Sequence, residues 1–440
     1  MRNGHVGFAI LTLCTGSLVN AQQVPTVPRP APQNTLTLPQ ATAIAIQSHP
    51  QIAAAQDTAA YAGQRITESR AAYYPVVDGE ITGAQGLYQS RLGAGALSAS
   101  QLFNRFGQGL QVTQLVTDFG RTKNLVGQSQ YQAQAAAQNT QASVYDVVLG
   151  VNRGYFGVLQ AQSYVKVAND TIRARQILTD QVTALANANL KSQLDVNFAA
   201  VNLSEAKLLL IRSQDALDQA YADLARALGQ DQAVRYQLAD VPSPGAPPDS
   251  PDPLIAQAIQ NRPELRSLQL QLQGAQSFEQ AETDLTHPSV SFIAVAGGLP
   301  YLGQDPRVAP YGYEGAALNV DIPIFNGHLF SARRQAAHYE TQATSERVRN
   351  LRQQVERDVR SAWISASTAW QRIPVTEQFL RQAQLALDLA QGRYDYGLAS
   401  IVEITQAQLN LTQAQIENVA AKYDYQTAYA QLQYTVGALR

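Results

Sequence analysis

The segment YDYGLASIVEITQAQLNLTQAQ, from Tyr394 to Gln415, decides the fold. A polar, helical pattern stops at Asp395-Tyr396-Gly397 and restarts within a few residues, so the chain must turn back sharply on itself. The same device occurs earlier as ANANLKSQLDVNFAAVNLSEAK, residues 186–207. Gly397 suits the left-handed backbone of such a turn, and Asn189 is the best substitute for glycine at the equivalent place. The sequence therefore predicts two helical hairpins.

The two hairpins belong to two copies of one plan. AIQSHPQIAAAQ (45–56) matches AIQNRPELRSLQ (258–269), and from the second predicted strand onward the copies match at an offset of 208 residues, as between Tyr155 and Trp363. We predict a first structural repeat over residues 38–230, built as helix, two strands, long helix and return helix. A Pro-rich linker follows over 231–253, and a second repeat occupies 254–440.

The N-terminus has the pattern of a secretory signal peptide over residues 1–21. One Arg precedes an apolar run that is too short to span a bilayer, and a small-residue cleavage site ends at Ala21. Residues 22–37 are predicted to form an extended segment. Cys14 follows Leu13, whereas a lipidated Cys normally follows a small residue, so we expect no lipid anchor. The signal indicates export from a bacterial cytoplasm.

Composition and motifs speak against several classes of function. A net charge of −2 over 440 residues gives no electrostatic case for nucleic-acid binding. The mature chain would have no Cys, and the five His residues (His5, His49, His287, His328 and His338) show no metal-ligand spacing. No nucleophile motif or phosphate-binding loop is present. We therefore predict no enzymatic activity, no metal and no cofactor.

Each repeat contains two extended stretches before its longest helix. They are predicted at 76–88, 106–116, 289–302 and 315–325, and the alternation in VDGEIT (77–82) suits a strand with one apolar and one polar face. After Gly120 and after Gly327, an unbroken helical pattern of roughly 65 residues predicts helices about 100 Å long. No segment after the signal has ~18 consecutive apolar residues, so any membrane span must consist of strands.

The return helices carry a seven-residue seam of small and large residues, which predicts left-handed coiled-coil packing. The seam comprises Ala199, Leu203, Ala206, Leu210, Ser213, Leu217, Ala220 and Leu224, then Ala407, Leu411, Ala414, Asn418, Ala421, Tyr425, Ala428 and Leu432. A second stripe (Val402, Leu409, Ile416 and Tyr423) runs beside it, so each helix should have two neighbours, as in a wall. The heptads alone also fit a soluble periplasmic coiled-coil scaffold.

Four strands per chain are too few to close a barrel in lipid, where edge N–H and C=O groups cannot remain unpaired. If the stretches span a membrane, copies of the chain must assemble. Two copies give eight strands and a nearly filled interior, whereas three give twelve strands and a pore. The residues alone do not decide between these numbers.

The sequence resembles the TolC-like family of outer-membrane efflux proteins over essentially the whole mature chain. The resemblance is carried by ATAIAIQSHPQI (41–52), VTQLVTDFGR (112–121), VDIPIFNG (320–327), ANLKSQLDV (188–196) and YGLASIVEI (396–404), in that duplicated order. It implies a predominantly α-helical homotrimer. A long coiled-coil helical barrel would extend into the periplasm, and four strands per chain would form a shared twelve-stranded transmembrane β-barrel in the outer membrane of a Gram-negative bacterium.

The resemblance also implies the function and the partners. Such a protein is the exit duct of a tripartite efflux or type I secretion system. It passively conducts substrates from a periplasmic adaptor (a membrane fusion protein) and an inner-membrane transporter. Adaptor hairpins would engage the tips, here Asn189, Leu190, Ser192, Gly397, Leu398 and Ser400. The plainer alternative is that these residues only stop helices.

A periplasmic gate near the tips is implied as well. The Tyr394 phenol would donate to Asp195, and Glu403 would repeat around the trimer as a carboxylate ring. Both acids also suit an ordinary helix N-terminus. The sequence departs from the family pattern at Ala399, where a basic residue is expected, and at Gln406, where an acidic one is expected. We expect the tips to be held by few polar contacts, because heptad packing is strongest far from them.

Overall fold

The computed structural model describes residues 35–84, 91–92, 100–101, 105–298 and 312–439. The predicted signal peptide and residues 22–34 of the predicted extended segment lie outside these ranges. In the first half the main elements are α1 (Leu38–Ser48), α2 (Pro50–Arg70), β2 (Val76–Ala84), β5 (Arg105–Thr117), α3 (Arg121–Asn187) and α4 (Gln193–Ala227). In the second half they are α5 (Asp252–Asn261), α6 (Pro263–Thr283), β7 (Ser289–Gly298), β8 (Gly312–Asp321), α7 (Leu329–Asp395) and α8 (Ile401–Val436).

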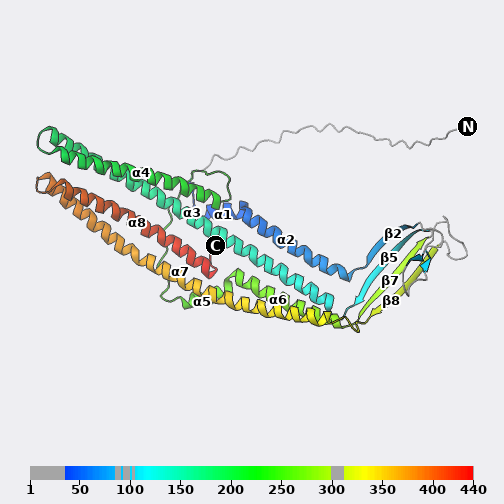
Figure 1. Cartoon of the computed structure of the whole chain (residues 1–440). Coiled ribbons are helices and arrows are strands. Elements are labelled where there is room, and N and C mark those ends of the chain that lie inside the picture. Colours follow the sequence, from blue (N-terminus) through cyan, green and yellow to red (C-terminus); the bar gives the residue numbers. More distant parts are fainter. Residues whose placement is uncertain (1–34, 85–90, 93–99, 102–104, 299–311, 440) are drawn as a thin grey trace, which may run out of the picture.

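The molecule is elongated, with its sheet at one end and both helical turns at the other (Figure 1). The main elements follow the same order in the two halves. Helices α3 and α7 have 67 residues each, which corresponds to about 100 Å and confirms the predicted long helices. Helices α4 and α8 return along them from the turns and end near the middle of the molecule, here called the waist (Figure 1).

Prolines set the breaks between the shorter helices. Pro50 and Pro263 are the first residues of α2 and α6, a position where the missing N–H has no intrahelical partner to lose. The residue before each of them, His49 or Arg262, has an extended backbone with ψ of 124° or 120°. Helices α1 and α5 therefore end at Ser48 and Asn261, two residues before each proline, because the α conformation is disfavoured for the residue in between.

Four antiparallel strands form one sheet in the order β2-β5-β7-β8. Its register places apolar residues in rows on one face, as in Val77 opposite Val112 and Phe292 opposite Leu318. The other face carries polar pairs such as Asp78 opposite Gln111, but β7 adds Ile293 and Val295 to it. The apolar face is not covered within the chain, since Ile81 and Leu318 are 75% and 68% exposed. The predicted division into one apolar and one polar face is confirmed for residues 77–82 of β2, from which it was predicted.

The strand bounds differ in part from the prediction. Strand β8 ends at Asp321, not at Phe325, because Pro323 has no N–H for the sheet and residues 322–328 leave it. At its other end β8 begins at Gly312, three residues earlier than predicted. Residues 85–88 and 299–302, which were predicted as strand, lie outside the described residues.

The coiled-coil seam is buried as predicted. Of the first-copy seam, Ala199, Leu203, Ala206, Ser213 and Leu224 are buried and the other three are half-buried. In the second copy Leu411 and Ala428 are half-buried, and the remaining six are buried. The second stripe differs along its length, because Val402 and Leu409 are exposed whereas Ile416 and Tyr423 are half-buried. Near the turns, one of the two predicted neighbours of α8 is therefore absent from the single chain.

The waist is held by contacts between segments far apart in the sequence. Strand β1 (Thr35–Leu36) pairs in parallel with β6 (Gln237–Leu238), which lies inside the predicted linker. The buried hydroxyl of Tyr155 on α3 lies 2.8 Å from the carbonyl oxygen of Leu36 and 2.6 Å from that of Ala239. Further along the linker, Trp363 Nε1 donates to the carbonyl of Pro248 at 2.7 Å. The linker thus lies against the helices of the second half.

We predict that Ala414→Leu lowers the thermal midpoint of the purified protein, followed by circular dichroism. Ala414 has no exposed surface, and overpacking such a position typically costs about 1–3 kcal/mol. The control is Gln413→Leu, which adds an apolar side chain at the neighbouring exposed position and should melt like wild type. Equal midpoints for Ala414→Leu and wild type would contradict close packing of the seam.

Candidate functional site at the helical tips

The two turns at the end of the hairpins have one shared construction. Asn189 and Gly397 both have left-handed backbones, with φ of 57° and 72°, which confirms the prediction from the sequence. The Leu190 N–H donates to the Leu185 carbonyl at 2.9 Å, and the Leu398 N–H donates to the Arg393 carbonyl at 2.8 Å. These are the closing hydrogen bonds of a Schellman motif.

Each return helix then begins with a serine cap. The Ser192 hydroxyl accepts from the Asp195 N–H, and the Asp195 carboxylate accepts in return from the Ser192 N–H at 3.1 Å. The Ser400 hydroxyl accepts from the Glu403 N–H at 3.3 Å. Caps of this kind satisfy helix N–H groups that have no intrahelical partner. Both turns are consequently fixed by hydrogen bonds within a few residues.

The shared construction exposes the same residue in both turns. Leu190 and Leu398 are each 70% exposed, although leucine prefers an apolar environment. The six predicted tip residues lie at one end of the molecule, opposite the sheet (Figure 1). This end therefore presents two equivalent apolar side chains on rigid turns.

Directly behind the turns lies an apolar cluster, here called the tip cluster. It comprises Leu178 and Val182 of α3, Tyr394 of α7, and Ala399, Ile401 and Ile404 around the start of α8. The tips are therefore held by apolar packing in addition to the few polar contacts that the sequence led us to expect. The heptad pattern read along one helix did not reveal these contacts, because they join the two hairpins.

The predicted hydrogen bond from Tyr394 to Asp195 is not formed. Only 3% of Tyr394 is exposed, and its hydroxyl has no hydrogen-bond partner among the described residues. The Asp195 carboxylate instead accepts hydrogen bonds from the N–H and the hydroxyl of Ser192. Burial is the main cause that raises the pKa of Tyr394, and the negative charges of Asp195 and Asp395 raise it further. The phenol thus remains neutral at physiological pH, in the field of two carboxylates.

Glu403 has a partner that the sequence analysis did not identify. Its Oε1 lies 3.1 Å from Nε of Arg393, in an exposed ion pair between the end of α7 and the start of α8. Lys191 of the first turn places its Nζ 4.7 Å from the centre of the Tyr394 ring, a cation–π distance. The resemblance led us to expect a basic residue at position 399, which is alanine. The tip has basic residues at positions 393 and 191 instead. In the sequence, the only indication that Arg393 lies at the tip was its position directly before Tyr394.

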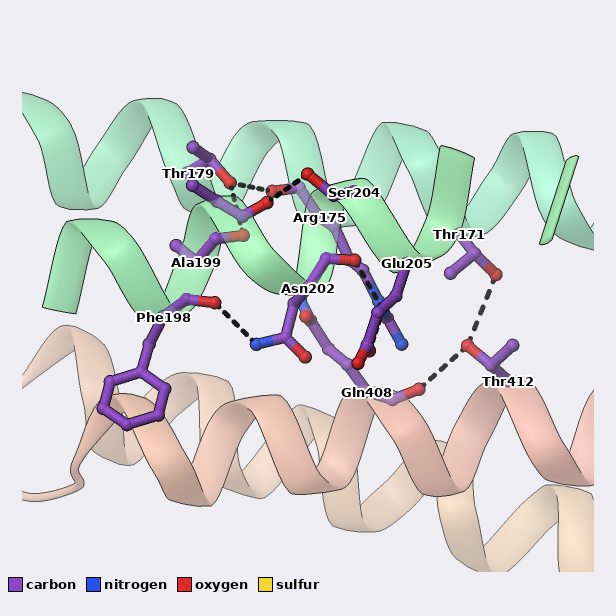
Figure 2. Close-up of polar contacts among 11 residues, drawn as sticks. Thr171, Arg175, Thr179, Phe198, Ala199, Asn202, Ser204, Glu205, Gln408 and Thr412 are labelled. Carbon is purple, nitrogen blue, oxygen red and sulfur yellow. Dashed lines mark hydrogen bonds and ion pairs between the residues drawn. The ribbon is translucent and has the colours of Figure 1, made fainter. Parts of the chain in front are cut away.

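A polar layer follows the tip cluster toward the waist (Figure 2). The buried Arg175 of α3 donates to the carbonyl oxygen of Asn202 at 2.6 Å and lies 3.4 Å from Glu205 of α4. The hydroxyls of Thr171 and Thr412 are 3.3 Å apart, and they join α3 to α8. Burial lowers the pKa of Arg175, but a guanidinium stays charged at neutral pH. The layer therefore places a positive charge inside the helical wall, and sequence reasoning missed it.

Among the described residues, none of the helices combines the length and apolarity needed to cross a membrane. The same residues contain no group of three or more His, Cys, Asp or Glu side chains placed to hold a metal ion. The fold itself is an elongated helical body with a small sheet whose apolar face is uncovered within the chain. This combination of a small sheet and very long helices is the fold of outer membrane channels.

The chain belongs to the outer membrane efflux protein family, which it matches over residues 42–230 and 254–438. The outer membrane protein TolC of Escherichia coli is 25% identical over 357 residues, covering 76% of this chain and 70% of that protein. The outer membrane efflux protein BepC of Brucella suis is 24% identical over 383 residues, covering 84% and 79% respectively. Proteins of this family are channels and not enzymes.

The fold is also that of a solved outer membrane channel. The crystal structure of CmeC from Campylobacter jejuni aligns with a TM-score of 0.78 at 14% sequence identity. The alignment covers 92% of this chain and 86% of CmeC. At this identity the likeness shows the fold alone.

We predict different results for two substitutions at Tyr394. Tyr394→Phe should leave thermal stability unchanged, because the hydroxyl has no partner within the chain. Tyr394→Ala should destabilise by about 3–5 kcal/mol, as expected for removing a buried aromatic ring. Thermal denaturation of both variants in detergent tests this. A large loss in Tyr394→Phe would mean that the phenol, and not the packing of the ring, holds the tip.

Proposed function

We propose that this chain is one subunit of a homotrimeric exit duct in a tripartite efflux or type I secretion system. The observation that carries the proposal is the four-stranded sheet, which has an uncovered apolar face and leads directly into two 67-residue helices. A sheet of this kind suits lipid on one side and water on the other. The duct would conduct substrates passively from a periplasmic adaptor and an inner-membrane transporter.

The edges of the sheet support assembly. Among the described residues, β2 and β8 each pair with only one strand. Their outer N–H and C=O groups would be unsatisfied in lipid, at a cost of several kcal/mol each. Pairing β8 of one copy with β2 of the next satisfies both edges at once. Three copies provide twelve strands, enough to leave a pore.

Exposed apolar residues on α4 and α7 also support assembly with neighbouring copies of the chain. Leu194, Val201 and Leu208 recur every seven residues along α4, and all three are exposed. On α7, Leu385 and Leu389 are exposed as well. Exposed heptad positions indicate a coiled-coil partner outside the chain. The closed wall of helices would continue the pore through the periplasm.

The gate that we propose lies at the tips. Packing of Tyr394 in the tip cluster would hold the hairpins together, with Asp195 nearby and the Arg393–Glu403 pair beside it. Repetition of Glu403 around the trimer would place carboxylates in a ring, and such rings set ion preference in pores. Displacement of the α7–α8 hairpin would separate Ile401 and Ile404 from α3 and open the duct.

Docking of the adaptor is proposed at the turns that hold Asn189, Leu190, Ser192, Gly397, Leu398 and Ser400. Six such turns would surround the open end of a trimer. Their exposed leucines suit apolar contact with helical hairpins of a partner.

The docking proposal predicts that Leu190→Asp with Leu398→Asp abolishes cross-linking to the adaptor. A carboxylate in an apolar contact loses its hydration without gaining a partner, whereas the sheet edges proposed to join the subunits lie at the other end of the molecule. The matched control is Leu190→Met with Leu398→Met, which keeps an apolar side chain at both turns. Normal cross-linking by the Asp variant would remove the docking role.

The duct proposal predicts that the full chain is extracted only by detergent, has the mass of three subunits, and forms ion-conducting pores in planar bilayers. Open-state conductance should appear after Tyr394→Ala loosens the tip cluster, with Tyr394→Phe as the control. Recovery of a monomer in the soluble periplasmic fraction would reject the duct in favour of a periplasmic coiled-coil scaffold.

A further inference from the structure

At the waist, the two halves of the chain meet through a defined contact between α3 and the end of α8. Arg153 donates to Oε1 of Gln431 at 2.5 Å, and the Tyr434 hydroxyl donates to Oδ1 of Asp146 at 2.5 Å. Beside these hydrogen bonds is an apolar cluster that contains Val148, Leu149, Ala430 and Leu439. This contact is here called the internal waist contact.

The repeat offset identifies the counterpart of each side of that contact. A shift of 208 residues converts α3 into α7 and α4 into α8, and it superimposes the left-handed helix caps Gly229 and Gly437, whose φ values are 70° and 73°. On α7 the counterparts of Val148, Leu149 and Arg153 are Glu356, Arg357 and Ser361. With Arg360, these residues line an open hollow on the surface of α7. In the described part of the chain, no helix packs on this face as the end of α8 packs on α3.

The counterpart of the α8 end is the end of α4. Gln431, Tyr434 and Leu439 correspond to Asp223, Arg226 and Asp231. All three counterparts are exposed, and they line a groove that Gly150, Gly154 and Gly157 of α3 deepen. None of the three forms an ion pair with another residue in the described part of the chain. The groove and the hollow are thus the repeat counterparts of the two sides of the internal waist contact, at two separate places on the chain.

The charges of the two halves are complementary. The α7 hollow has two arginines and one glutamate, whereas the α4 end has two aspartates and one arginine. Arg357 contacts Asp358, and Arg360 lies 3.7 Å from Asp252, but both are exposed pairs of low individual energy. Positions that are apolar in the internal waist contact, Val148, Leu149 and Leu439, become Glu356, Arg357 and Asp231 in the second.

We infer that a second copy of this chain docks the end of its α4 (Asp223, Arg226 and Asp231) on the α7 hollow (Glu356, Arg357 and Arg360). This inference rests on the proposed homotrimer and names its contact at the waist. Because each chain offers one hollow and one α4 end, the contact is heterologous, and a threefold rotation between the copies of the proposed homotrimer closes it into a ring. Every long helix of the ring would then have a return helix on the same face. Within a chain, α8 packs on α3 through apolar residues, and between chains α4 would bind α7 through ion pairs.

A cysteine pair tests the position of the contact. In a Cys14→Ser background, Ser361→Cys and Asp223→Cys replace the counterparts of the hydrogen-bonded Arg153 and Gln431. Treatment of the detergent-solubilised full chain with a bismaleimide should join chains into dimers and trimers on a denaturing gel. The matched control, Arg153→Cys with Gln431→Cys, should cross-link without joining chains.

The mass of the untreated protein separates the two ways in which this test can fail. A trimer by native mass spectrometry that yields only single chains after treatment would overturn the waist contact and leave the duct intact. A monomer in every detergent tested would overturn the proposed function together with the contact.

Charge reversal tests the ionic character of the contact. Arg357→Glu with Arg360→Glu should lower the trimer-to-monomer ratio at least about tenfold, because like charges would then face each other. Asp223→Arg with Asp231→Arg should do the same, and the four changes combined should restore the ratio. All four side chains are exposed, so the folded chain should tolerate them. At about 1 M salt the defects should diminish, because exposed charges are screened. Failure of the combined variant to recover would overturn the ionic contact.

Discussion

The open edges of the four-stranded sheet are the constraint on which the rest of the architecture depends. Strands β2 and β8 leave one side of their backbone unpaired within the described chain, and the sheet's apolar face is uncovered. Only Asp118-Phe119-Gly120 separate β5 from α3, and only residues 322–328 separate β8 from α7. Any arrangement that satisfies the edges therefore also sets the long helices around the same axis. Lipid, which leaves backbone groups no water to bind, would in this way organise a helical tunnel that it does not touch.

Repetition within the chain gives each long helix two kinds of neighbour. Around α3, the end of α8 is covalently tethered, so apolar side chains such as Val148 and Leu149 can be buried as the chain folds. Around α7, the equivalent return helix would have to come from another copy. A chain with Val and Leu on that free face would expose an apolar patch before assembly, with a risk of unspecific association. Glu356 and Arg357 keep the face soluble and make its pairing dependent on charge.

The sequence predicted most reliably what local chemistry decides. The left-handed residues Asn189 and Gly397 and the seven-residue seam are patterns within single turns or helices, and both were found as predicted. Pairing of β1 with β6 inside the linker was not predictable, because nothing in two short segments two hundred residues apart marks them as partners. The tip cluster and the buried Arg175 were missed for the same reason, since both depend on how two hairpins lie against each other. The early end of β8 could have been predicted from the sequence, because Pro323 has no N–H to donate to a sheet.

The way in which the tips are held limits how they can move. Each turn is locked locally, by a Schellman hydrogen bond on one side and a serine cap on the other, so neither can unwind without losing several hydrogen bonds at once. Between the hairpins, by contrast, Tyr394 contributes an apolar ring and no hydrogen bond to a described residue. Apolar packing is not directional, so one hairpin can slide against the other at a lower cost than breaking an aligned hydrogen bond in a dry site. Opening in the proposed gate is therefore a movement of a whole hairpin, with the turn as its rigid end. A partner that binds the exposed Leu398 would act on that end, and the helices would carry its movement to the tip cluster.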